Sequence, residues 1–210
     1  MDFITQGITI FHKGGFVMYI LLLCSLFVLS IGIERFLYFR QLDSGRQFAA
    51  VFYRLMNNDK FAEAQQLTAT SHGSLALILH SAMIKSPMAA NNIKAFFEIQ
   101  SGIILAKFRR RLYYLNVIVT MAPLLGLLGT ISGMISAFSV FNLQSGQTAT
   151  ITGGVGEALI ATAMGLCVAI ISLIIHAYFT QRIDNIITDM EQSFSLVEAY
   201  YARGENHASA

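Results

Sequence analysis

Polar side chains are rare in the apolar stretches of this chain, and three of them define the chemistry that those stretches could support. Thr130 and Thr162 place hydroxyls inside two long uncharged runs, and Glu157 stands at the start of the run that contains Thr162. A hydroxyl accepts and donates hydrogen bonds without carrying charge, whereas a carboxylate inside a bilayer is costly and usually functional, and the cost is smaller at the end of a span. These residue types suit water or protons, although each threonine could instead bond its own helix backbone.

Glu157 is the only acidic residue within or bordering the second and third apolar runs. A carboxylate at the start of a helix would also suit a simple interaction with the helix dipole. His176 lies near the other end of the third run, where a lone histidine is more often a hydrogen-bonded packing residue than a proton carrier. Because the runs contain no pair of deep carboxylates, a proton path here would need a buried acid from another subunit.

The composition indicates a membrane protein. Of 210 residues, 55% are hydrophobic and only 12% are charged, about half the charge of a typical soluble domain. A net charge of +2 is too mild to indicate nucleic-acid binding. Two cysteines make neither a disulfide framework nor a zinc site. The sequence also lacks phosphate-binding, zinc-protease and serine-hydrolase motifs, so we expect no enzyme activity, no metal and no cofactor.

The apolar runs are long enough for three transmembrane helices, since about 20 apolar residues cross the hydrocarbon core. The first run is longer than the apolar part of a signal peptide, and no small-residue cleavage motif precedes Glu34 and Arg35. We therefore expect it to be retained. The predicted organisation is a short outer head at 1–15, transmembrane helices at 16–39, 112–141 and 157–181, a cytoplasmic helical segment at 40–111, an outer loop at 142–156, and a cytoplasmic helical tail at 182–210.

The distribution of lysine and arginine predicts the orientation. The positive-inside rule places segment 40–111 and the tail in the cytoplasm, so that the N-terminus and loop 142–156 face the periplasm. Segment 40–111 holds ten of the fourteen basic residues: Arg40, Arg46, Arg54, Lys60, Lys85, Lys94, Lys107, Arg109, Arg110 and Arg111.

The cytoplasmic parts have the periodicity of packed helices. We expect a first helix around Phe48 and Phe52, a short one from Lys60 to Thr70, and an interruption at Pro87. One continuous helix is expected over about 90–141. The tail places apolar residues on one face: Ile183, Ile186, Ile187, Met190, Phe194 and Val197.

Small residues are concentrated in the second and third apolar runs, a pattern that lets membrane helices approach closely. In the second run a Gly-x-x-x-Gly pair is formed by Gly129 and Gly133, and Pro123 removes one backbone donor. Tight packing alone could explain the whole pattern. The residues expected to pack helices or face a partner are Gly126, Gly129, Gly133, Ala158, Gly165 and Ala169.

Three segments resemble the MotA/TolQ/ExbB proton-channel family. Residues 121–138, MAPLLGLLGTISGMISAF, are similar to its second-helix motif, and residues 156–170, GEALIATAMGLCVAI, to its third-helix motif. Residues 14–24, GGFVMYILLLC, followed by Ile33, Glu34 and Arg35, resemble its first helix. Many relatives have proline after the Ala-Ile of the third helix, whereas Ile171 stands there in this chain.

The resemblance implies an all-α, multi-pass protein of the bacterial inner membrane that assembles as a homopentameric ring. In this family the ring surrounds two single-span subunits of the ExbD/TolR type, which supply a membrane aspartate, and the motor acts on a TonB- or TolA-like protein. By position, Thr130 and Thr162 would line the pore and Glu157 would be the acidic residue.

The resemblance leaves the physiological role open. Three spans and one large cytoplasmic segment favour an ExbB- or TolQ-like chain over a MotA-like one, and the short outer head favours ExbB. The alternatives are a TolQ-like subunit for envelope integrity and a non-conducting helical scaffold in the membrane.

Overall fold

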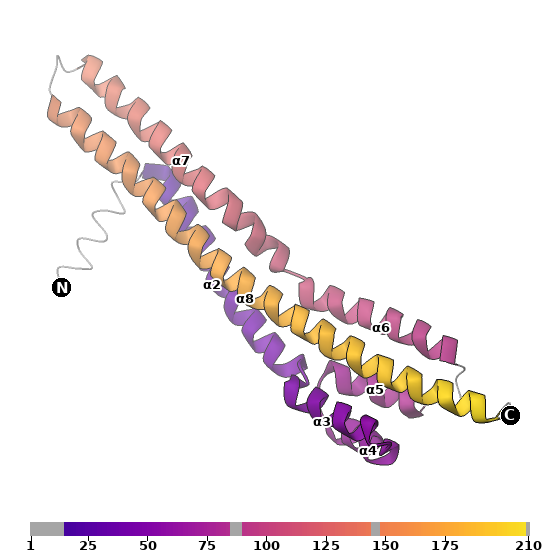
Figure 1. The fold of residues 1–210 in the computed structure, drawn as a ribbon. Helices are drawn as coiled ribbons and strands as arrows, with labels where there is room; N and C mark the ends of the chain where they lie inside the picture. The colour runs from indigo at the N-terminus through magenta and orange to yellow at the C-terminus, as the bar shows by residue number, and fades with distance from the viewer. Residues whose placement is uncertain (1–14, 85–89, 144–147, 209–210) are drawn as a thin grey trace, which may run out of the picture. The chain divides into compact units, whose positions relative to one another are not determined.

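A computed structural model of the chain describes residues 15–84, 90–143 and 148–208, and these residues are entirely helical apart from short turns (Figure 1). The chain divides into two compact units, one formed by 1–34 and 111–178 and the other by 35–110 and 179–210. The helices described are α2 (Gly15–Leu42), α3 (Gly45–Asn57), α4 (Phe61–Thr70), α5 (Ser74–Ile84), α6 (Ala90–Arg109), α7 (Leu112–Leu143) and α8 (Thr148–Ala208).

Three helical stretches of the described chain are long and apolar enough to cross a membrane, judged by length and composition. They belong to α2, α7 and α8. Many of their large apolar side chains have no cover within the chain; Leu23, Leu124 and Ile174 are 67%, 64% and 63% exposed. Such exposure is unfavourable in water and fits a surface that meets lipid or other protein.

The predicted outer segments lie partly outside the described residues. This applies to the predicted head at 1–15, of which only Gly15 is described, and to residues 144–147 of the predicted loop. The flanking parts of that loop are helical, because α7 ends at Leu143 and α8 already begins at Thr148. The Gly, Ser and Thr content of 142–156 is therefore compatible with helix at both ends.

The first unit is built around an antiparallel pair formed by α7 and the first half of α8, which run side by side (Figure 1). Their register follows from close neighbours, since Gly126 lies against Thr162 and Gly133 lies against Ala158. α7 continues through Pro123 without interruption. The first half of α2 packs on this pair and buries Leu21 and Val28 almost completely.

The second unit has an aromatic and aliphatic core between the tail of α8 and the short helices. Phe97 of α6 stacks on Phe194 of α8 with ring centroids 4.0 Å apart, and Phe39 contacts both Phe108 and Phe179 at 4.9 and 5.1 Å. The predicted apolar face of the tail is confirmed. Its buried members are Ile183, Ile186, Met190, Phe194 and Val197, and Ile187 is half-buried.

The short helices of the second unit follow the predicted pattern closely. Phe48 and Phe52 are buried on α3, and α4 ends at Thr70 as predicted. The turn before α5 depends on Gly73, whose φ of +112° is a backbone conformation that other residues rarely adopt. The predicted interruption at Pro87 lies outside the described residues.

The expected continuous helix over 90–141 is wrong, because α6 ends at Arg109 and α7 begins at Leu112. Arg111 between them adopts a φ of +74°, which is uncommon for a residue other than glycine. Within the second unit the buried guanidinium of Arg35 donates from Nη1 to the carbonyl oxygen of Lys107 at 3.2 Å and, more weakly, to that of Phe108 at 3.4 Å. These carbonyls belong to the last turn of α6, where helical partners run out. A tertiary cap therefore supports the end of this helix.

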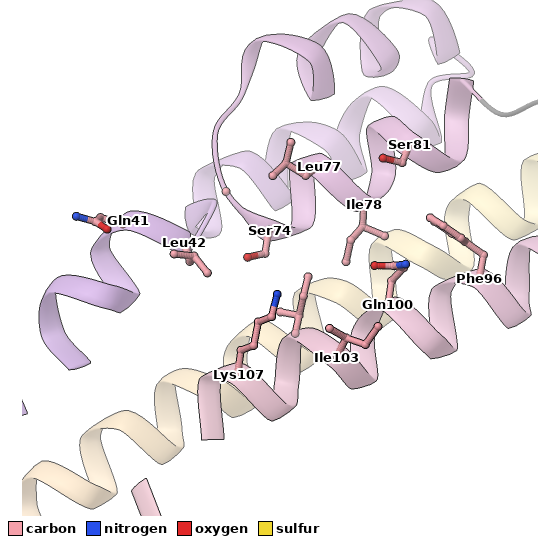
Figure 2. Close-up of a pocket in the computed structure, with 12 residues that line it drawn as sticks. Gln41, Leu42, Ser74, Leu77, Ile78, Ser81, Phe96, Gln100, Ile103 and Lys107 are labelled. Atoms are coloured by element: carbon pink, nitrogen blue, oxygen red, sulfur yellow. The ribbon is translucent and has the colours of Figure 1, made fainter. Parts of the chain in front are cut away.

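A half-open cavity of about 490 Å³ lies in the second unit between the end of α2, α5 and α6. Figure 2 shows the Lys107 side chain reaching from α6 towards Ser74 on α5, with Ile78 and Ile103 on facing helices. The wall is mixed in character, because serine and glutamine side chains alternate with aliphatic ones.

Ionisable side chains join the end of α2 and α3 to the tail of α8 in the second unit. Asp43 and Arg182 form an ion pair of 2.8 Å, and Arg46 Nη2 donates to Asn185 Oδ1 at 2.8 Å. Burial raises the pKa of the nearby Asp189 carboxyl above its ordinary value; Asp43 adds to the rise, whereas Arg46 and Arg182 oppose it. The ionised form of Asp189 is therefore disfavoured in the folded protein.

We predict that Asp189→Asn raises the midpoint temperature of unfolding at pH 7. A carboxyl whose pKa is raised by folding favours the folded state below its unfolded pKa, and that contribution is lost as the pH rises through the folded pKa. The advantage of the variant should therefore shrink between pH 7 and about pH 4. Circular dichroism of the purified chain in detergent measures it, with Glu191→Gln, an exposed position on the same helix, as the matched control. A gain that is equal at both pH values would contradict the prediction.

Candidate functional site

The candidate site is centred on the contact between α7 and α8 in the first unit, where glycines remove the side chains that would hold the helices apart. A Cβ atom added at Gly165 would lie 2.5 Å from the carbonyl oxygen of Ala122 and 3.0 Å from the Cα of Gly126. A Cβ atom added at Gly126 would lie 3.0 Å from the Cα of Thr162. At this point the two backbones are in direct contact.

Two further glycines of α7 extend the contact along the helices. A Cβ atom at Gly129 would lie 2.6 Å from the Cβ of Ala161, and one at Gly133 would lie 3.0 Å from the Cβ of Ala158. Ala158 and Ala169 are buried, with 2% and 7% of their surface exposed. The four glycines chosen from the sequence thus lie at the contact between α7 and α8, with Ala158 opposite Gly133, and Ala169 is buried on α8.

Thr162 uses this close approach for a hydrogen bond between the helices. Its Oγ1 donates to the carbonyl oxygen of Gly126 on α7 at 3.1 Å, and the side chain is half-buried. The hydroxyl proton is therefore directed at backbone, while lone pairs of the oxygen remain available as acceptors. Because Gly126 and Gly165 carry no side chain, the two helices approach closely enough for this bond to form.

Thr130 follows Gly126 by about one helical turn on α7. Its Oγ1 donates to the carbonyl oxygen of Leu127 in the same helix at 2.6 Å, and the side chain is half-buried. The two threonines thus differ in their partner, within one helix for Thr130 and between helices for Thr162. In both, the hydroxyl donates to a carbonyl and leaves its oxygen as an acceptor.

The structure describes the other two polar residues of the site, Glu157 and His176, in less detail. Glu157 lies in α8, but its side chain is outside the part of the chain that the structure describes. His176 is half-buried on α8. Among the described residues, no group of three or more histidine, cysteine, aspartate or glutamate side chains could hold a metal ion.

Ser172 lies on the small-residue stripe of the third apolar run and makes a further contact, although it was not among the packing residues chosen from the sequence. Its Oγ is fully buried and donates to the carbonyl oxygen of Leu115 on α7 at 3.0 Å. The signal available in the sequence was its position, since Ser172 follows Gly165 by two turns on the inner stripe of α8. A second hydroxyl-to-backbone bond thus joins the same pair of helices.

This arrangement is that of a membrane subunit whose polar groups are neutral hydroxyls held between closely packed helices. The sequence profile of the MotA/TolQ/ExbB proton channel family matches residues 60–192, and the chain belongs to this family.

Individual relatives cover much of the chain. The ExbB-like biopolymer transport protein 1 of Synechocystis is 31% identical over 170 residues, which are 79% of this chain and 67% of that protein. The ExbB-like protein 3 of the same organism is 29% identical over 90% of this chain and 92% of its own length. The Tol-Pal system protein TolQ of Haemophilus influenzae is 33% identical over 51% of this chain and 45% of its own length.

We predict that Gly165→Ala separates α7 from α8 and lowers stability by about 2 kcal/mol, because the new methyl group meets backbone that cannot rotate away. The matched control is Gly156→Ala on the same helix, where an added Cβ atom meets nothing within 4 Å. Thermal unfolding and size-exclusion chromatography in detergent compare the two variants. Equal stability of both would show that the close approach of the helices does not matter.

Proposed function

We propose that the chain is the ring-forming proton-channel subunit of an inner-membrane motor of the ExbB-ExbD type, which converts proton motive force into mechanical work on a TonB-like partner for outer-membrane transport. Five copies form the ring around two single-span ExbD/TolR-like subunits. The N-terminus faces the periplasm and the C-terminus the cytoplasm, in agreement with the basic residues of segment 40–111.

The observation that supports this proposal best is the hydrogen bonding of Thr162. Its hydroxyl donates to Gly126, so the oxygen faces any further neighbour as an acceptor. A protonated carboxyl group is a donor and suits this acceptor, whereas an ionised carboxylate has no proton to offer. Threonines arranged in this way favour the protonated form of an acid that passes them.

The acid itself must come from a partner. Within 112–181 the sequence contains one acidic residue, Glu157, and it stands at the outer end of the third predicted span. An aspartate on a single-span subunit would supply the titrating group that the deeper parts of these spans lack. Glu157 would then serve at the outer mouth by attracting cations or contacting the partner.

Closed symmetry explains how a three-helix chain could line a path. One copy cannot enclose a polar channel, whereas a ring repeats Thr130 and Thr162 around the axis without adding charge. Each proton that crosses releases about 2.3 kcal/mol per 100 mV, so work accumulates over many steps. Gly126, Gly129 and Gly133 let α7 pack directly against α8 within each copy.

An ExbB-like role is favoured over a TolQ-like one by the short predicted outer head and the sequence of the first helix. Coverage does not separate the two roles, because the ExbB of Salmonella typhimurium aligns over 33% of this chain and the TolQ of H. influenzae over 51%. The alternative of a TolQ-like subunit for envelope integrity would pair the chain with TolR- and TolA-like proteins. The sequence of the single-span protein encoded beside this chain distinguishes the two roles.

The test is a set of three substitutions at Thr162 in the intact complex with the single-span partner, followed as proton flux into sealed vesicles. We predict that Thr162→Val, which is nearly isosteric but lacks the oxygen, lowers flux at least tenfold. Thr162→Ser retains the oxygen and should retain most of the flux. Thr162→Ala removes oxygen and methyl together and should resemble the valine variant.

The complex must assemble in each case, which size-exclusion chromatography and partner stoichiometry establish. Full flux in an assembled Thr162→Val complex would contradict the channel role and favour a purely structural scaffold. Equal loss in the valine and serine variants would indicate that packing rather than the hydroxyl is needed.

A further inference from the structure

A second, smaller cavity lies in the first unit, beside the predicted inner ends of two membrane spans. It has a volume of about 200 Å³ and is formed by α2 and the start of α7. Its lining combines apolar and aromatic side chains with one acid and one base: Phe27, Ser30, Ile31, Glu34, Arg111 and Tyr114. The proton path proposed above uses none of these residues.

The polar end of the cavity is an ion pair between adjacent helices. Arg111 Nη1 lies 2.6 Å from Glu34 Oε2, and the two side chains are 48% and 37% exposed. A guanidinium has five N–H donors, so this contact leaves others directed elsewhere. The cavity therefore presents a fixed positive group and a fixed negative group side by side.

The apolar end continues into the predicted membrane span. Phe27 and Ile31 precede Glu34 on α2 by about two turns and one turn. Phe27 meets Tyr114 of α7 edge-on with ring centroids 6.3 Å apart, and both rings are about half exposed, at 48% and 52%. A tyrosine with an exposed ring beside an arginine is typical of the headgroup level of a bilayer.

We propose that this cavity binds one phospholipid with a primary-amine headgroup, of the phosphatidylethanolamine class, from the leaflet on the side of segment 40–111. Arg111 binds the phosphate, Glu34 accepts a hydrogen bond from the ammonium, and the upper part of an acyl chain lies along Phe27 and Ile31. The pair of opposite charges in the protein thereby matches the pair of opposite charges in the headgroup.

The chemistry of the pair disfavours two other common headgroup classes. An anionic headgroup without an amine, such as phosphatidylglycerol, satisfies Arg111 but brings its negative charge next to the Glu34 carboxylate. A phosphatidylcholine headgroup is zwitterionic, but its trimethylated nitrogen has no N–H to donate. Hydrogen bonds to charged groups are among the strongest in proteins, so a headgroup without this N–H donor should be retained measurably less.

The experiment is lipid competition on the purified full-length chain. The wild-type protein is exchanged into equimolar phosphatidylethanolamine, phosphatidylcholine and phosphatidylglycerol with identical acyl chains, and the lipids it retains are identified by native mass spectrometry. We expect phosphatidylethanolamine to be retained about tenfold over each of the others. This test needs no variant and no proton flux, so it is independent of the proposed channel function.

Substitutions then test the contact of Glu34 with the ammonium and that of Arg111 with the phosphate separately. Glu34→Gln should reduce the preference for phosphatidylethanolamine over phosphatidylcholine to about one while lipid is still retained. Arg111→Gln should lower retention of all three lipids. Arg110→Gln removes an exposed neighbouring charge that does not line the cavity and should leave the wild-type pattern unchanged.

Three outcomes would overturn the proposal. Equal retention of the three lipids by the wild-type chain would show only a non-selective lipid annulus. A preference for phosphatidylglycerol would show that Arg111 acts without Glu34. No retained lipid at all would show that the cavity is covered in the assembled protein, for instance by a second copy of the chain.

Discussion

The rest of the first unit depends on the direct backbone contact between α7 and α8. A Cβ atom added at Gly165 would lie only 2.5 Å from a carbonyl oxygen of α7, and one added at Gly126 would lie 3.0 Å from a backbone Cα of α8. This proximity lets a threonine and a serine side chain, Thr162 and Ser172, reach carbonyl oxygens of the neighbouring helix. In a bilayer the hydrophobic effect does not hold helices together, so close packing and such bonds must do so. The same contact therefore provides both cohesion and the orientation of the Thr162 hydroxyl.

The distribution of charge follows from the same constraint. A tightly packed pair of membrane helices leaves little room for ionised groups, and the sequence of α7 contains none. Charged side chains instead gather near the ends of the predicted spans, where Glu34 pairs with Arg111 and Arg35 caps the last turn of α6. In the proposed motor, the titrating acid deep in the membrane would then come from a separate subunit, which can move relative to the proposed ring.

Much of this structure could be predicted from the sequence, because the signals are local. Helical periodicity located the buried face of the tail, including Met190 and Phe194, and the length of the apolar runs located three helices that could span a membrane. The end of α6 could not be predicted, because the residues around Arg111 continue a helical pattern. The last turn of α6 is capped by Arg35, which lies more than seventy residues earlier in the chain. The partner of the Thr162 hydroxyl also depends on helix register, which no local pattern specifies.

The central claim is that this chain supplies a neutral, hydroxyl-lined path and that a single-span partner supplies the acid. The most direct measurement is proton flux in sealed vesicles that contain the wild-type chain either alone or with that partner. We expect no flux above the lipid background for the chain alone and clear flux for the complex. Equal flux in both preparations would contradict it, as would a well-formed complex that conducts no protons.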